Sequence, residues 1–199
     1  MAYPTVSAPY GLKPVNRVDG LPYAGATRYL PIGSSNDTTI FYGDVVKLVG
    51  GLVVKDVGTD AATPIGVFMG CTYTDPNSQQ KLFKQYYPAD TAASDIQAYV
   101  VDDPFAVFKV AVVTVATTTM NGVASTAIGS NGMLVQNTGS TISGNSSVGI
   151  ASAIGTTTTQ PLRIVGLVEE TKNAAGSYTE VLVVWNFGMH RYLNTTGTA

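Results

Sequence analysis

Few side chains in this sequence could support nucleophilic catalysis. His190 is the only imidazole and Cys71 the only thiol among the 199 residues, so a Ser-His-Asp or Cys-His mechanism would have to use His190. Cys71 lies among apolar residues of a predicted strand, where a buried, inert thiol is the usual outcome. His190 follows the last strongly apolar segment of the chain, and we expect it to be exposed to solvent or to lie in an interface.

Paired carboxylates are the other source of acid–base chemistry. Asp102-Asp103 and Glu169-Glu170 are adjacent pairs, but neighbours along a strand point to opposite faces, so neither pair converges on a substrate by itself. Pro104 follows the first pair, which favours a turn there. The chain contains no Gly-x-Ser-x-Gly, Gly-x-x-x-x-Gly-Lys-Ser/Thr or Asp-x-Asp-x-Asp-Gly motif. We expect no catalytic residue, no cofactor and no bound metal.

The composition points to a protein of low charge. Hydrophobic residues make up 45% and charged residues 12% of the chain, and the net charge is −2. A basic surface for nucleic acid or for an anionic membrane is therefore not expected. The first residues lack the features of a secretory signal, and no apolar run is long enough to span a bilayer, so we expect synthesis in a cytoplasm. Low charge reduces the cost of burying surface in an assembly.

Residues 1–33 form a predicted N-terminal arm. Five prolines and four glycines interrupt this segment, and each proline fixes φ and removes a backbone donor, so we expect extended chain rather than helix. An arm of this kind packs on its own domain or reaches a neighbouring subunit, and the sequence leaves both open. The arm residues that we expect to contact another protein or another subunit are Tyr3, Pro4, Tyr10, Leu12 and Tyr23.

Residues 34–192 form a predicted β-rich domain. Gly50-Gly51 separates two β-branched runs and predicts a hairpin. Residues 105–115 are the longest such run, and Trp185 with the strand before it is expected in the core or in an interface between subunits. Residues 117–160 are rich in Thr, Ser and Gly, carry no charge, and suggest loops and short strands. With a polar tail at 193–199, this predicts an all-β fold: a sandwich or barrel-like core of short antiparallel strands with a Pro-rich arm.

Four segments together resemble a known group of proteins. They are Ala8-Pro9-Tyr10-Gly11-Leu12-Lys13-Pro14-Val15, Ile40-Phe41-Tyr42-Gly43-Asp44-Val45-Val46, residues 64–75 (Pro-Ile-Gly-Val-Phe-Met-Gly-Cys-Thr-Tyr-Thr-Asp) and Asp102-Asp103-Pro104. This set resembles head proteins of tailed bacteriophages, particularly aquatic and cyanobacterial ones, and looks like their capsid decoration, or cement, proteins. The resemblance covers roughly residues 1–110.

The resemblance implies a structural virion protein. Such a protein would be a β-rich homotrimer on the outer surface of the phage head, where it clamps neighbouring major capsid subunits against internal DNA pressure. Its partners would be the major capsid protein and other copies of itself, with no direct contact to nucleic acid and none to a membrane. Two other hypotheses stay open: a tail, fibre or host-attachment component that uses the uncharged region 117–160, and an enzyme acting on polysaccharide through its carboxylate pairs.

Overall fold

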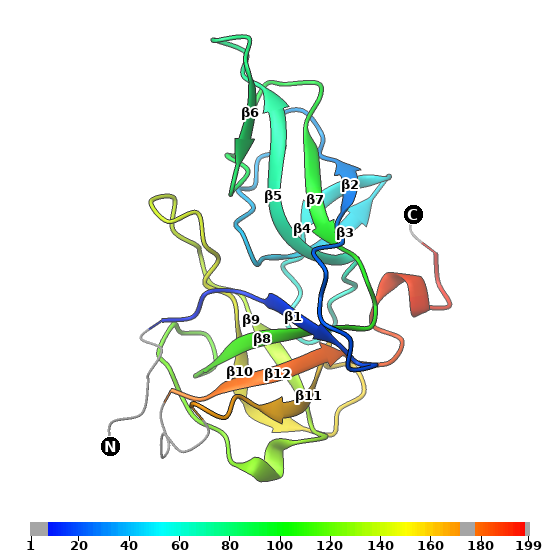
Figure 1. The fold of residues 1–199 in the computed structure, drawn as a ribbon, viewed down its shortest axis with the longest axis vertical. Helices are drawn as coiled ribbons and strands as arrows, with labels where there is room; N and C mark the ends of the chain where they lie inside the picture. The colour runs from blue at the N-terminus through cyan, green and yellow to red at the C-terminus, as the bar shows by residue number, and fades with distance from the viewer. Residues whose placement is uncertain (1–7, 172–177, 198–199) are drawn as a thin grey trace.

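The chain folds almost entirely into β-structure, with 40% of residues in strands and 3% in helical turns. The computed structural model describes residues 8–171 and 178–197 (Figure 1). Two short 3-10 turns, η1 (Ser125–Ala127) and η2 (Arg191–Leu193), accompany the strands. The strands are β1 (Lys13–Arg17), β2 (Arg28–Pro31), β3 (Val45–Val49), β4 (Leu52–Lys55), β5 (Gly66–Thr74), β6 (Lys81–Lys84), β7 (Gln97–Val101), β8 (Ala106–Val113), β9 (Asn131–Val135), β10 (Gly149–Gly155), β11 (Leu162–Leu167) and β12 (Glu180–Trp185).

Five strands close into a barrel, which confirms the all-β, barrel-like prediction. The order is β8-β10-β9-β11-β12, and β12 returns to pair with β8. β8 and β10 are parallel, whereas the other neighbours in the barrel are antiparallel. β8 is the long β-branched run, and it is buried on both faces: Phe108, Val110 and Val112 fill the barrel, while Ala111 and Val113 pack under the outer loops. Trp185 lies in the barrel core, against the ring of Phe108.

The second sheet stands above the barrel in Figure 1. Its order is β2-β7-β5-β3-β4, and β6 pairs with β5 as an extra edge strand. β3 and β4 form the predicted hairpin, with Val49 opposite Leu52 and both turn glycines at positive φ. This sheet has its own apolar core, whose largest members are Phe68, Tyr87 and several isoleucines.

The N-terminal segment contributes one strand to each part of the molecule. β1 lies antiparallel along β8 in the barrel, and β2 lies antiparallel along β7 in the second sheet. Pro14 and Pro31 are tolerated because β1 and β2 stand at the ends of their sheet orders, where a missing N–H costs little. The register of β1 against β8 shifts directly after Pro14, between Pro14 and Asn16. Residues 13–31 therefore link the barrel to the second sheet.

Candidate interaction surfaces

Three segments that carry the resemblance meet where the barrel joins the second sheet. The N–H of Leu12 donates to the carbonyl of Gly43 (2.9 Å), and the N–H of Gly43 donates to the carbonyl of Phe68 (2.8 Å). Gly11 has φ +81°, and a Cβ there would lie 2.7 Å from the oxygen of Gly43. Only glycine fits this crossing of two backbones, so these motif residues shape the fold.

The buried carboxylate of Asp44 connects the barrel and the second sheet at the same junction. Its side chain is fully buried and lies 3.0 Å from Nζ of Lys55. It also accepts the N–H of Phe41 (2.9 Å) and the hydroxyl of Ser146 (2.6 Å). Ser146 precedes β10 of the barrel, whereas Asp44 precedes β3 of the second sheet. The carboxylate therefore joins the two parts, and each of its oxygens accepts at least one hydrogen bond.

The predicted contact residues of the arm are placed differently from one another. Leu12 is fully buried in the barrel core, so its side chain packs inside the subunit. The hydroxyl of Tyr10 donates to the buried carboxylate of Glu180, which with burial raises the pKa of Tyr10. Tyr23 is partly exposed, and its hydroxyl donates to the carbonyl of Ala26 (2.8 Å). Tyr3 and Pro4 lie outside the described residues.

Cys71 is buried in the fold, and the Asp102-Asp103 pair forms hydrogen bonds within the chain. Cys71 is buried, as predicted, and burial raises the pKa of its thiol to about 12. Asp102 accepts hydrogen bonds from the guanidinium of Arg28 and from the hydroxyl of Tyr192 (2.7 Å). Asp103 accepts the N–H of Phe105 (2.9 Å), which forms the predicted turn. The two carboxylates therefore bond to groups of their own chain.

His190 is fully buried, so the prediction of an exposed or interfacial histidine was wrong. Its Nδ1 accepts the N–H of Tyr192 (3.2 Å), and its ring lies 6.1 Å from the ring of Trp185. The next residue, Arg191, donates its N–H to the carbonyl of Pro64 (2.9 Å), which draws this segment onto the start of β5. Burial lowers the pKa of the imidazole and keeps it neutral.

One open cavity has a volume of about 670 Å³. Its walls combine polar side chains, mostly threonines with Gln136 and Asn137, with the apolar side chains of Phe41 and Val57. The cation on its wall, Lys55, is the one already paired with Asp44. Within residues 8–171 and 178–197, no three His, Cys, Asp or Glu side chains gather as metal ligands would.

The most exposed phenylalanine of the described chain stands on a rigid turn. Phe187 is 84% exposed, and its N–H donates to Oδ1 of Asn186 (3.0 Å). Asn186 is buried, and its Nδ2 donates to the carbonyls of Thr158 and Gln160, each at 3.0 Å. The guanidinium of Arg163 donates to the same Oδ1 (2.9 Å). The network fixes the backbone that holds the ring out to solvent.

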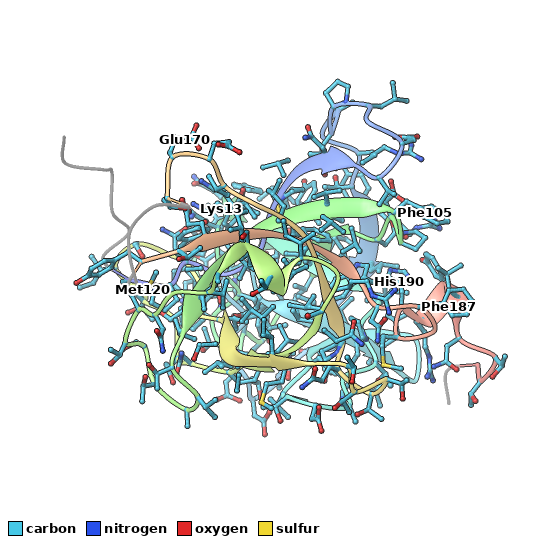
Figure 2. The ribbon with its side chains drawn as sticks, turned by 90° about the horizontal axis from the view of Figure 1, so that it is seen from below. Lys13, Phe105, Met120, Glu170, Phe187 and His190 are labelled. Carbon is cyan, nitrogen blue, oxygen red and sulfur yellow. The ribbon has the colours of Figure 1, made fainter. Side chains whose placement is uncertain are left out.

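Three further apolar side chains lie at this end of the barrel. Val18, Leu21 and Phe105 are each at least half exposed, and the N–H of Val18 donates to the carbonyl of Phe105 (2.9 Å). β12 runs antiparallel to β8, so it ends, at Trp185, on the side of the barrel where β8 begins. Figure 2 shows Phe105 and Phe187 on the same flank of the molecule.

A second exposed apolar side chain stands at the tip of a loop. Ile142 is 99% exposed on the loop between β9 and β10, which rises beside the second sheet in Figure 1. Ser140 donates its N–H to the carbonyl of Asn145 (2.9 Å), and Gly144 donates to the carbonyl of Ser140 (2.7 Å). Gln85 of the second sheet anchors the loop through the side chain of Asn145 (2.9 Å). This loop, like the turn at Phe187, is held by hydrogen bonds.

An aromatic cluster covers one face of the second sheet. The ring of Tyr99 lies 4.7 Å from that of Tyr29 and 5.6 Å from that of Phe83. Phe83 also lies over Gly70, where a Cβ would be 2.9 Å from the ring. The ring covers a glycine that could not carry a side chain, so this cluster stabilises the attachment of β6.

Comparison with known proteins adds no relative: no protein-family model, no curated protein and no solved structure matches the chain. In the part of the chain that the structure describes, no helix has the length and apolar character needed to cross a membrane.

Proposed function

We propose that this protein is a structural component of a phage head, a decoration protein that binds the outer surface of the assembled capsid. The observation that carries the proposal is the presentation of large apolar side chains, Phe187 and Ile142, on loops fixed by hydrogen bonds. Exposed apolar residues on rigid supports are typical of interfaces, because little conformational freedom is lost when a partner covers them. The resemblance of residues 1–110 to cement proteins supports the same role.

The hydrogen bonds of His190, Asp102 and Asp103 agree with this role. The ring of His190 accepts a backbone N–H, and the carboxylates of Asp102 and Asp103 accept hydrogen bonds from the same chain. Their side chains stabilise a rigid body. A rigid body that binds the assembled lattice, and binds free capsid subunits less well, stabilises that lattice by mass action. Its partners in the proposal are the major capsid protein and further copies of this chain.

The contact role of the arm is proposed for the residues before the barrel. Leu12 lies in the core and Tyr10 bonds to Glu180, so removing them would damage the fold itself. Deleting residues 2–7, which include Tyr3 and Pro4, removes the first part of the arm while keeping β1 and β2. We expect this variant to melt like the full chain but to occupy fewer sites on capsids. Unchanged occupancy would contradict the arm's role.

Electron cryomicroscopy of the native particle tests the proposal directly. Density for this fold on the outside of the head, with one copy or one oligomer at every equivalent lattice position, is the expected result. A few copies at the tail would instead indicate a tail, fibre or host-attachment component. Absence from the particle would refute any structural virion role.

A further inference from the structure

We infer that the open cavity of about 670 Å³ is a binding site for a neutral saccharide. Its walls come from three segments: residues 37–41 before β3, Lys55 and Val57 at the end of β4, and residues 136–141 after β9. The volume lies within the range of about 300–1,000 Å³ that is usual for small-molecule sites. We call it the threonine cavity, after Thr38, Thr39, Thr138 and Thr141.

The threonine hydroxyls match the hydrogen-bonding groups of a sugar. Each hydroxyl both donates and accepts hydrogen bonds, as each hydroxyl of a sugar does. Thr138 and Thr141 are exposed, and within residues 8–171 and 178–197 neither side chain forms a hydrogen bond. Thr38 donates its hydroxyl proton to Asp37 (2.9 Å), so its oxygen is available as an acceptor. The wall thus offers donors and acceptors to the hydroxyl groups of a ligand.

The wall that follows β9 is held in place by both parts of the molecule. Nε2 of Gln136 donates to the carbonyls of Asp56 (2.9 Å) and Gly58 (3.0 Å), which follow β4 of the second sheet. Nδ2 of Asn137 donates to the carbonyl of Thr117 (3.0 Å), which follows β8 of the barrel. A site that is fixed before binding loses little conformational entropy when a ligand occupies it.

The charges at the threonine cavity favour a neutral ligand. Lys55 and Asp37 are the charged residues that line it. Nζ of Lys55 lies 3.0 Å from the buried carboxylate of Asp44, so the charge of this lysine is already balanced. The exposed carboxylate of Asp37 would repel a phosphate or carboxylate group, and an ammonium group would face Lys55. A neutral hydroxyl avoids both repulsions and can donate a charge-assisted hydrogen bond to Asp37.

Two apolar side chains of the wall match the C–H groups of a sugar ring. Val57 is 64% exposed, and Phe41 lines the same cavity. The ring of Phe41 is fixed, because the ring of Tyr86 stacks 5.7 Å from it and a Cβ at Gly139 would lie 2.5 Å from it. The C–H groups between the hydroxyls of a sugar gain from contact with apolar side chains, whereas a simple ion has no such groups. The combination of hydroxyl and apolar groups therefore favours a saccharide.

NMR titration of the full-length protein tests the inference. The probes are glucose, galactose, mannose and N-acetylglucosamine, each also as its disaccharide, with glycerol as a control polyol. We expect at least one neutral sugar to bind with a Kd of about 1 mM or tighter and to shift the methyl signals of Thr138, Thr141 and Val57. The 6-phosphate of that sugar should bind more weakly, because it carries the charge that Asp37 repels. The inference is overturned if no neutral sugar shifts these signals, if glycerol shifts them equally, or if the 6-phosphate binds as tightly.

Threonine-to-valine variants locate the site. Thr138→Val and Thr141→Val each remove one hydroxyl and should weaken sugar binding by about three- to tenfold, as the loss of one hydrogen bond does. Thr159→Val is the matched control, since it makes the same change in the loop between β10 and β11, outside the cavity wall. All three positions are exposed, so all three variants should melt like the wild type. Unchanged affinity in both cavity variants, or an equal loss in Thr159→Val, would contradict the assigned site.

The saccharide site goes beyond the proposed decoration role and does not depend on it. A protein that binds sugar but is absent from phage particles would refute the decoration role alone. A protein present on the phage head whose cavity binds no neutral sugar would refute the saccharide site alone.

Discussion

The barrel and the second sheet are stabilised in different ways. The barrel is a closed ring of strands around an apolar core, and the charge-free region 117–160 supplies two of its strands. The second sheet keeps an extra edge strand and depends on buried carboxylates: Asp44 pairs with Lys55, and Asp56 accepts the N–H groups of Gly58 (3.0 Å) and Thr63 (2.9 Å). Both parts enclose an apolar core, and Glu180 on β12 is a buried carboxylate of the barrel. The contrast is that the barrel closes on itself, whereas the second sheet keeps open edges and has buried carboxylates at its junction and after β4.

The largest expected loss of stability is at the junction of the barrel and the second sheet, where Asp44 is buried. Asp44→Ala should lower the free energy of unfolding by about 3–5 kcal/mol, because it leaves Lys55 as a largely buried charge without its partner. Urea denaturation followed by circular dichroism measures the change. Asp37→Ala removes an exposed carboxylate as a control and should change stability little. A small loss for Asp44→Ala, similar to that of the control, would contradict the importance of the polar junction.

The next largest loss of stability is expected at Gly11, whose backbone lies close to that of Gly43. Gly11→Ala should cost about 2–4 kcal/mol, the sum of strain at positive φ and a clash with Gly43 and Ser146. Gly20 has nearly the same φ, +83°, but nothing lies within 4 Å of the position that a Cβ would take there. Gly20→Ala should therefore show the conformational strain alone, about 1 kcal/mol. Equal thermal shifts for the two variants would mean that the crossing at Gly11 is not tight.

A polar group placed in the barrel should be more harmful than the same group on its surface. Val183→Thr keeps the shape of a buried core residue but adds a hydroxyl among apolar side chains. It should lower the free energy of unfolding by about 1–3 kcal/mol. Val184→Thr, the next residue on β12 and partly exposed, should change stability by less than about 0.5 kcal/mol. Chemical denaturation of both variants compares them. Equal losses would remove the proposed distinction between the barrel interior and its surface.

The smallest expected effect is a pH dependence of the free energy of unfolding, caused by His190 at the contact of the barrel and the second sheet. Burial lowers the pKa of His190 below its ordinary value of 6.5, so the unfolded chain binds a proton before the folded chain does. The stabilising effect of the neutral ring is complete above pH 6.5 and is lost as pH falls from there through the folded pKa. The slope for one such group cannot exceed about 1.4 kcal/mol per pH unit. His190→Asn keeps a side-chain acceptor without titrating, and an unchanged pH profile in this variant would exclude His190 as the cause.

The local elements of the fold were predictable from the sequence. Gly50-Gly51 between β-branched runs specifies a hairpin through turn geometry alone, and residues 105–115 have the composition of a buried strand. The closing of the barrel was not predictable, because it depends on pairing between β8 and β12, which are far apart in the sequence. The proline-rich segment was expected as an arm, yet it supplies β1 and β2, since prolines are tolerated at sheet edges.

The candidate surfaces were less accessible to sequence reasoning. Phe187 and Ile142 are apolar, and hydrophobicity predicts burial, so no local signal marks them as exposed. His190 stands in a segment that looks like a polar loop, but the contact of Arg191 with Pro64 buries it. For the same reason Leu12, chosen as a contact residue, lies in the core: the partners that bury it are distant in sequence.

The closure of the barrel by β12 has a consequence for biosynthesis. Every strand of the second sheet lies between residues 28 and 101, whereas the barrel needs its last strand at residues 180–185. During synthesis the second sheet can therefore form early, while β8 waits with an open edge until the final strand emerges. Truncated nascent chains that stop before β12 should expose that edge and aggregate, so the synthesis of residues 180–185 decides whether a stable barrel results.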